Sequence, residues 1–225
     1  MLRLRQVVVA ATDLRATRTR IEDELGVPHV WADPGVGHFG LRNALYAVGD
    51  CFVEVVSPKT ADAPARRFLD RVGHDAGYMA IVQTTDALDD VRSRADALGV
   101  RIVFEAIGDG VTGLHLHPAD TQGALLSIDR CDDDAAWPWA GPAWDAAPLR
   151  GYQRLARATF AVAEPATVAA RWAQLLGTEA DGPSITLDDS ALEFVAGDAG
   201  LCAVELVGPR RDPVEIAGVT FSSTE

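Results

Sequence analysis

Apolar runs and helix-like segments follow one another in an order that occurs three times along the chain. Residues 7–11, Val-Val-Val-Ala-Ala, predict a strand, and apolar residues at helical spacing then lead to Gly26. The same strand-then-helix order precedes Gly99 and Gly177, at spacings of 73 and 78 residues. Because these spacings are nearly equal, the pattern predicts an internal repeat.

Each predicted helix is followed by three strand-like segments, so each repeat is predicted to be β-α-β-β-β. Aligned on the glycine that ends the helix, the last strand of each repeat carries one polar residue among apolar ones: Glu54, Ser127 and Glu205. A polar residue within an apolar strand needs a hydrogen-bond partner or a wet cavity. A unit of about 55 residues cannot cover its own sheet, so the units are expected to pair.

The repeat sets the expected domain limits and an α+β fold class. We expect two paired βαβββ modules at residues 1–58 and 77–130, which together make a domain of residues 1–130. Residues 131–151 are rich in Asp, Ala, Pro and Trp and predict a linker, whose three tryptophans cover either the open side of the sheet or an interface. Residues 152–225 are expected to form a third, partial βαβββ module. With no fourth copy beside it, this module must pack on the first pair or on another chain.

Composition narrows the classes of partner. The chain is 48% hydrophobic and carries a formal net charge of -13, which disfavours binding to nucleic acid or to anionic membranes. It has no span of about 20 apolar residues, and its three cysteines are isolated. We therefore expect a soluble, unprocessed, cytoplasmic protein with a small-molecule partner.

Two histidines stand on one predicted strand, Leu114 to His117. His115 and His117 alternate with leucines, so both are expected on the same face. If that face lines a cavity, they supply an acid-base pair or, with Glu54, a displaced metal site. If it faces outward, they are surface residues, and His117 bonds within the turn that begins at Pro118.

These repeats resemble the vicinal-oxygen-chelate superfamily, which includes glyoxalase I, bleomycin-resistance proteins, extradiol dioxygenases and methylmalonyl-CoA epimerase. The resemblance covers residues 1–130 and, more loosely, 152–221. The segment from His117 to Leu126 looks most like the epimerase branch, and residues 40–54 look like glyoxalase-like domains. The resemblance implies that the two paired modules curl into a half-barrel around a cavity, with divalent-metal ligands from the first and last strands.

The positions that the resemblance assigns to metal ligands are Gln6, Glu54, Met79 and Ser127. A thioether and a hydroxyl are poor ligands for the divalent ions of this family, so we expect that the metal site is lost and that no cofactor is bound. Met79 is then expected to fill the core. In the third module the matching residues are Arg157 and Glu205, which predict an ion pair.

Glu54 has two interpretations. Burial can raise its pKa and make it a general base for taking a proton next to a carbonyl, or it can be a structural carboxylate bonded to Gln6. His38 lies in the glycine-rich stretch 35–40, which is either a flap over the cavity or a hairpin loop. Arg42 and Asn43 on the next strand either hold a carboxylate or carbonyl of a ligand or are solvated.

Two functional hypotheses follow, and neither settles whether the protein is an enzyme. The first is a metal-independent binding protein that holds an organic molecule in the half-barrel. The second is a lyase or isomerase for a carbonyl or acyl-thioester substrate, with Glu54 as base and a divalent metal held by His115 or His117. A third possibility is an interaction module, including a homodimer, in which the third module finds its partner in another chain.

Overall fold

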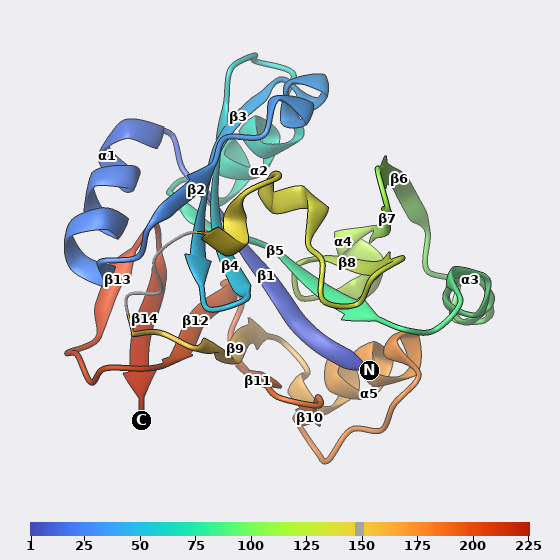
Figure 1. Ribbon diagram of the computed structural model, residues 1–225. Coiled ribbons are helices and arrows are strands. Elements are labelled where there is room, and N and C mark those ends of the chain that lie inside the picture. The colour runs from blue at the N-terminus through green and yellow to red at the C-terminus, as the bar shows by residue number, and fades with distance from the viewer. Residues whose placement is uncertain (147–150) are drawn as a thin grey trace.

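The computed structural model describes residues 1–146 and 151–225. Within these residues the strands form one eight-stranded and one six-stranded sheet, in the α+β class expected (Figure 1). The first sheet and its helices comprise β1 (Leu2–Ala10), α1 (Leu14–Arg20), β2 (His29–Trp31), β3 (Leu41–Val48), β4 (Cys51–Pro58), α2 (Pro64–Val72), β5 (Ala76–Thr84), α3 (Leu88–Ala97), β6 (Ile102–Gly108), β7 (Val111–Leu116), α4 (Pro118–Thr121) and β8 (Leu125–Cys131).

The helices of the repeat end where the sequence pattern places their ends. A one-turn π-helix (Ile21–Leu25) extends α1 to Gly26, which adopts a left-handed conformation at φ 68°. Gly99 follows α3 at φ 62°, and Gly177 ends the helix of the third repeat at φ 73°. Only glycine adopts this conformation without steric cost, so the three glycines fix the helix lengths.

The eight-stranded sheet is made of two similar halves in the order β2-β3-β4-β1-β5-β8-β7-β6. In each half the last strand runs parallel to the first: β4 beside β1, and β8 beside β5. The two first strands, β1 and β5, pair antiparallel at the centre. The two βαβββ modules therefore join edge to edge into one curled half-barrel sheet, as expected.

The second sheet is built from β9 (Arg154–Val162), α5 (Pro165–Leu176), β10 (Ser184–Thr186), β11 (Ala191–Ala196), β12 (Gly200–Val207), β13 (Val214–Ile216) and β14 (Val219–Thr224). Its order is β10-β11-β9-β12-β14-β13. Here β11 is the parallel neighbour of β9, whereas β12 pairs with β9 antiparallel, as β5 does with β1. β14 then runs parallel to β12, as β8 does to β5.

This register corrects one expectation. Glu205 lies on β12, opposite Arg157 of an antiparallel neighbour, so it does not match Glu54 and Ser127, which lie on strands parallel to the first strand of their module. The second sheet thus contains a third repeat shortened by one strand and, in β12 to β14, part of a fourth repeat without its helix. The expectation that no fourth copy stands beside the third was wrong. The predicted contact between Arg157 and Glu205 is present, at 3.8 Å.

The two sheets share one hydrophobic core. Side chains from one face of the first sheet, from α3 and α5, and from the second sheet belong to a single buried cluster that includes Val7, Val55, Phe160, Trp172 and Val204. The third repeat therefore covers its apolar face within the same chain. The opposite face of the first sheet, which we call the inner face of the half-barrel, carries a separate and smaller hydrophobic cluster.

No helix in the described part of the chain is long and apolar enough to cross a membrane.

Candidate functional site

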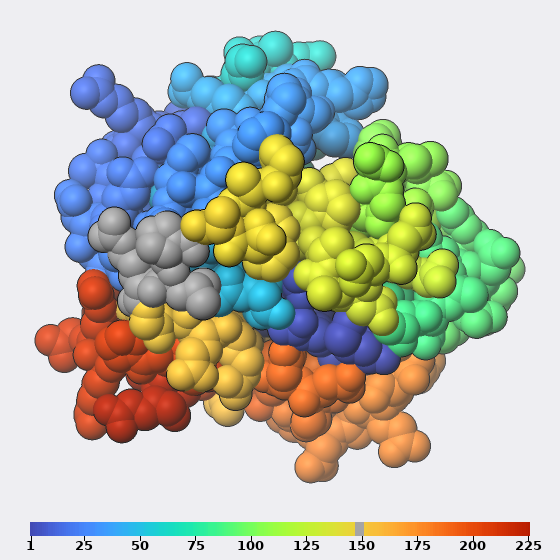
Figure 2. Space-filling model, viewed as in Figure 1, coloured from blue at the N-terminus to red at the C-terminus, as the bar shows by residue number. Residues whose placement is uncertain are grey.

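The segment after β8 lies across the inner face of the half-barrel. Residues 132–146 run through two short 3-10 helices, Pro138–Ala140 and Trp144–Ala146, and belong to the predicted linker, of which residues 147–150 lie outside the described residues. Trp137 and Ala140 are fully buried in the same cluster as Val8, Phe52 and Met79. In Figure 2 this segment (yellow) fills the space between the first module (blue) and the second (green). The tryptophans thus cover the open side of the sheet.

Glu54 is the centre of a buried hydrogen-bond network on this face. Gln6 donates through Nε2 to Oε2 of Glu54 at 2.7 Å, and Asn43 donates through Nδ2 to Oε1 at 2.6 Å. The Trp137 indole donates to Oε1 of Gln6 at 2.8 Å, and the backbone N–H of Asp33 donates to Oδ1 of Asn43 at 2.9 Å. The contact between Glu54 and Gln6 was predicted from the sequence.

The direction of these bonds is fixed at both outer ends. An indole N–H and a backbone N–H can only donate, so each amide turns its oxygen outward and its NH₂ group toward Glu54. Both carboxylate oxygens of Glu54 therefore accept hydrogen bonds. Burial nevertheless raises the pKa of Glu54 to about 7, because the hydrogen bonds from Asn43 and Gln6 lower it only in part. Near neutral pH this group can accept or release a proton.

Asp129 is a second buried carboxyl group, on β8 of the other module. It accepts hydrogen bonds from the Ser127 hydroxyl and, at 2.7 Å, from the indole of Trp139. Burial raises its pKa to about 7 as well. Gly113 lies directly opposite on β7, where a Cβ would come within 2.6 Å of the Asp129 carboxylate. A role for Asp129 was not predicted from the sequence.

The two carboxyl groups lie on the same inner face of the half-barrel, one in each module. Glu54 lies on β4 and Asp129 on β8, with β1 and β5 between them. Neighbouring strands are about 4.8 Å apart, so β4 and β8 are about 14 Å apart across the sheet. Glu54 is level with Val8 and Met79, whereas Asp129 is level with Gln83, further along β5. A molecule that contacts both groups must therefore extend along the strands as well as across them.

The structure separates the two histidines. His115 lies on the inner face, in register with Ser127, with its ring 5.5 Å from that of Phe104. Burial lowers the pKa of His115 to about 4, so its imidazole is neutral at physiological pH. His117 follows the end of β7 and caps α4, because its Nδ1 accepts the N–H of Ala119 at 3.1 Å. This confirms the interpretation that His117 bonds within the turn that begins at Pro118.

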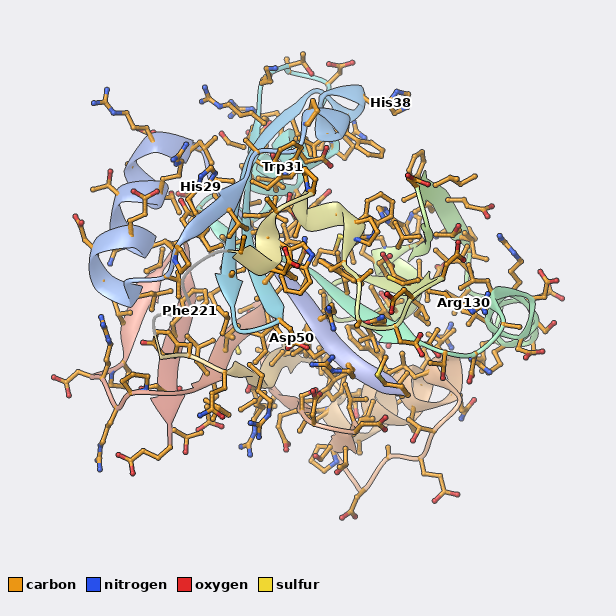
Figure 3. All side chains as sticks on the ribbon, viewed as in Figure 1. His29, Trp31, His38, Asp50, Arg130 and Phe221 are labelled. Carbon is orange, nitrogen blue, oxygen red and sulfur yellow. The ribbon has the colours of Figure 1, made fainter. Side chains whose placement is uncertain are left out.

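The remaining predicted site residues lie in different parts of the structure. Asn43 is buried on the inner face, whereas Arg42 is exposed and, by strand alternation, points to the other side of the sheet. His38 is exposed on the 3-10 helix Pro34–Phe39 and lies at the edge of the molecule (Figure 3). Its neighbour Phe39 packs edge-on against Phe104 at 4.7 Å, which joins the rims of the two modules. Met79 is part of the inner apolar cluster, as expected.

The side chains at the four ligand positions do not fit a divalent metal. Both oxygens of Glu54 accept amide hydrogens, and the oxygen of Gln6 accepts the Trp137 indole. Ser127 donates to Asp129, and Met79 offers only a thioether. Across the described residues, no group of three or more His, Cys, Asp and Glu side chains is arranged to hold a metal ion. These four side chains therefore do not form a divalent-metal site.

Comparison with known folds agrees with this architecture. A variant of the methylmalonyl-CoA epimerase of Streptomyces coelicolor in complex with 2-nitronate-propionyl-CoA superposes with a TM-score of 0.51 at 21% identity, over 57% of this chain and 94% of that one. The methylmalonyl-CoA epimerase of Mycobacterium tuberculosis gives 0.50 at 26% identity, over 57% and 87%. A hypothetical protein from Bacillus halodurans gives 0.52 at 16% identity, over 60% and 99%.

Sequence comparison assigns the family. No curated protein sequence matches the chain significantly. The family model described as the glyoxalase-like domain matches residues 7–176, from within β1 through the rest of both modules of the first sheet, the linker, β9 and α5. The match covers well over half of the chain, and the superpositions agree with the vicinal-oxygen-chelate fold. The chain therefore belongs to the glyoxalase-like domain family.

Proposed function

We propose that the protein binds a small organic molecule in the half-barrel of residues 1–130, between Glu54 and Asp129, without a divalent metal. The observation that carries this proposal is the pair of buried carboxyl groups, each with a pKa raised to about 7, on one otherwise apolar face. Burying two such groups costs free energy, and sites that bind ligands or perform chemistry are where such costs are concentrated.

The surroundings suit a molecule with an apolar body and polar ends. Phe52, Met79 and Ile81 supply an apolar floor between the two carboxyl groups. Glu54, held by Gln6 and Asn43, would accept a donor at one end, and Asp129 with Ser127 would do so at the other. Few polar groups on an apolar wall are typical of small-molecule sites.

A thermal-shift screen against acyl-CoAs, aromatic small molecules and divalent metal salts tests this proposal. An organic ligand at 100 times its Kd should stabilise the wild-type protein by about 2.7 kcal/mol through mass action. Glu54→Gln should abolish the shift, because the glutamine NH₂ group would face the NH₂ group of Gln6 or Asn43 and disrupt the network. Arg42→Ala, which removes an exposed side chain that points away from the inner face, should keep it.

Measuring the metal content of the purified protein can contradict the proposal. Elemental analysis of the purified wild-type protein should find no stoichiometric divalent metal. A stoichiometric metal that disappears in Glu54→Ala would show that Glu54 is a ligand and that the site works through a metal.

A second candidate is an isomerase that moves a proton next to the carbonyl of an acyl thioester, with Glu54 as base. It is favoured by the near-neutral pKa of Glu54, which is the range for efficient proton abstraction, and by the similarity to methylmalonyl-CoA epimerases. The test is exchange of the α-hydrogen of an acyl-CoA for deuterium. The rate should rise with pH around 7 and be lost in Glu54→Gln; exchange that persists in this variant would exclude Glu54 as the base.

A further inference from the structure

The segment Trp137-Pro138-Trp139, which we call the tryptophan plug, bonds to both halves of the site. The Trp137 indole donates to Oε1 of Gln6 at 2.8 Å, next to Glu54. The Trp139 indole donates to Oδ2 of Asp129 at 2.7 Å. The plug thus places one N–H donor at each end of the proposed ligand site.

The flat rings of the plug occupy the apolar part of the same site. The Trp137 ring stacks on Phe52 with a centroid separation of 6.5 Å, and the guanidinium of Arg5 lies 5.4 Å from its centre. Trp139 lies directly on Gly108, where a Cβ would come within 2.8 Å of its ring. The plug therefore occupies the space that a bound molecule would need.

The segment carrying the plug is held by an incomplete set of polar contacts. Arg5 donates to the carbonyl of Ala135, and Gln83 donates to the carbonyl of Asp134, both at 2.9 Å. Yet Nε of Arg5 and Oε1 of Gln83 are the two buried side-chain polar atoms that lack a partner within the described residues. Unpaired buried polar groups cost free energy, so this closed arrangement is less favourable than a fully satisfied one.

We propose that the tryptophan plug is an internal mimic of the ligand, and that the molecule bound here is a planar aromatic compound with an N–H donor that enters by displacing the plug. This inference rests on the proposed function and adds the class of ligand and the way into the site.

The ligand class follows from the groups that the plug covers. The atoms it bonds, Oε1 of Gln6 and Oδ2 of Asp129, are both acceptors, so a replacement that lacks a donor leaves a buried acceptor unpaired. The space beside Phe52 takes a flat ring, and the cation of Arg5 favours the face of an aromatic ring over an aliphatic chain.

The closed plug reduces the apparent affinity. Only the fraction of molecules with the plug displaced can bind, so the apparent Kd is the intrinsic Kd divided by that fraction. A change that weakens the plug without altering the acceptors should therefore tighten binding. Losing one hydrogen bond to a carboxylate raises the open fraction roughly tenfold.

Two variants weaken the plug, and a third serves as control. Trp139→Phe keeps a ring and removes the N–H. Gly108→Ala leaves every polar group in place but puts a Cβ 2.8 Å from the Trp139 ring and 2.9 Å from Cγ1 of Val111. Gly37→Ala is the matched control, because a Cβ at that position meets no atom within 4 Å. Calorimetric titration of all four proteins, the wild type included, with indole and with N-methylindole measures binding, and hydrogen exchange of the Ala140 and Gly141 amides reports opening.

Indole should bind Trp139→Phe roughly tenfold more tightly than the wild type and Gly37→Ala, and it should also bind Gly108→Ala more tightly than these two. N-methylindole should bind at least several-fold more weakly than indole, and indole should speed exchange of the two amides. Equal indole affinity in all four proteins with unchanged exchange would overturn displacement of the plug while leaving the proposed function standing. Absence of indole binding in all four, or equal binding of N-methylindole, would overturn the ligand class.

Discussion

Trp172→Ala should lower the free energy of unfolding by about 3–5 kcal/mol, the cost expected when a buried tryptophan is truncated. Trp172 on α5 is fully buried against Phe160 at 4.8 Å and Phe194 at 5.3 Å. Its indole also donates to the carbonyl of Thr121 at 2.8 Å, which ties the second sheet to the α4 turn of the first. Truncation therefore leaves a cavity and removes a bond between the two sheets.

Urea unfolding followed by circular dichroism measures this effect. Because both sheets share one hydrophobic cluster, we expect a single transition that moves to lower urea in the variant. Trp172→Phe is the control, since it keeps most of the ring packing and should lose only part of the stability. Two separate transitions, with the one from the first sheet unchanged, would contradict the shared core.

The repeat was predictable because its signals are local. A β-branched run, a helical apolar period and a glycine with positive φ each act within a few residues, so the elements around Gly26, Gly99 and Gly177 follow from the sequence. The direction in which a strand pairs is set by contacts distant in sequence. For this reason Glu205 was aligned with Glu54, although its strand is antiparallel to the first strand of its repeat.

The candidate site likewise combines residues that could be predicted from the sequence with one that could not. Glu54 and Gln6 lie in apolar strands. A polar residue at such a position is predicted to be buried and to need a hydrogen-bond partner, so both residues could be identified from the sequence. Asp129 precedes the exposed Arg130 and the acidic stretch Asp132 to Asp134, so by composition it resembles a solvated strand end. Its burial depends on Trp139, which reaches it only because the linker folds back over the half-barrel. That fold-back has no local signal.

The separation of the histidines has a local cause that the alternation of residues concealed. Proline is favoured in the first turn of a helix, so Pro118 starts α4 directly after β7. His117 then becomes the N-cap, and its side chain bonds to the first turn of that helix. The alternating pattern extends one residue further than the strand.

The stability of Asp129→Asn relative to the wild type should rise with pH. The pKa of Asp129 is raised by burial from 3.8 to about 7 in the folded protein, so between these values the folded state holds a proton that the unfolded state has lost. Stability of the wild type therefore falls as pH rises through this window, by up to about 4 kcal/mol from this group. Asparagine has no such ionisation.

The asparagine variant keeps the hydrogen bonds of the site. Its oxygen can accept the Trp139 indole, and its NH₂ group can donate to Ser127, whose hydroxyl can rotate to accept. Urea unfolding at pH values from 4 to 8 should therefore give nearly equal stabilities at pH 4 and a variant that is more stable at pH 8. A difference that is constant with pH would mean that Asp129 is not a buried acid with a raised pKa.

Asp120→Asn gives a control of opposite sign. Asp120 accepts hydrogen bonds from the side chain and backbone of Arg101, and these hold its pKa below the usual value. Its ionised form therefore stabilises the folded state, and the wild type should gain on this variant as pH rises through the acidic range below the ordinary pKa of an aspartate. Opposite slopes for the two substitutions would separate burial of Asp129 from any general effect of the net charge of -13.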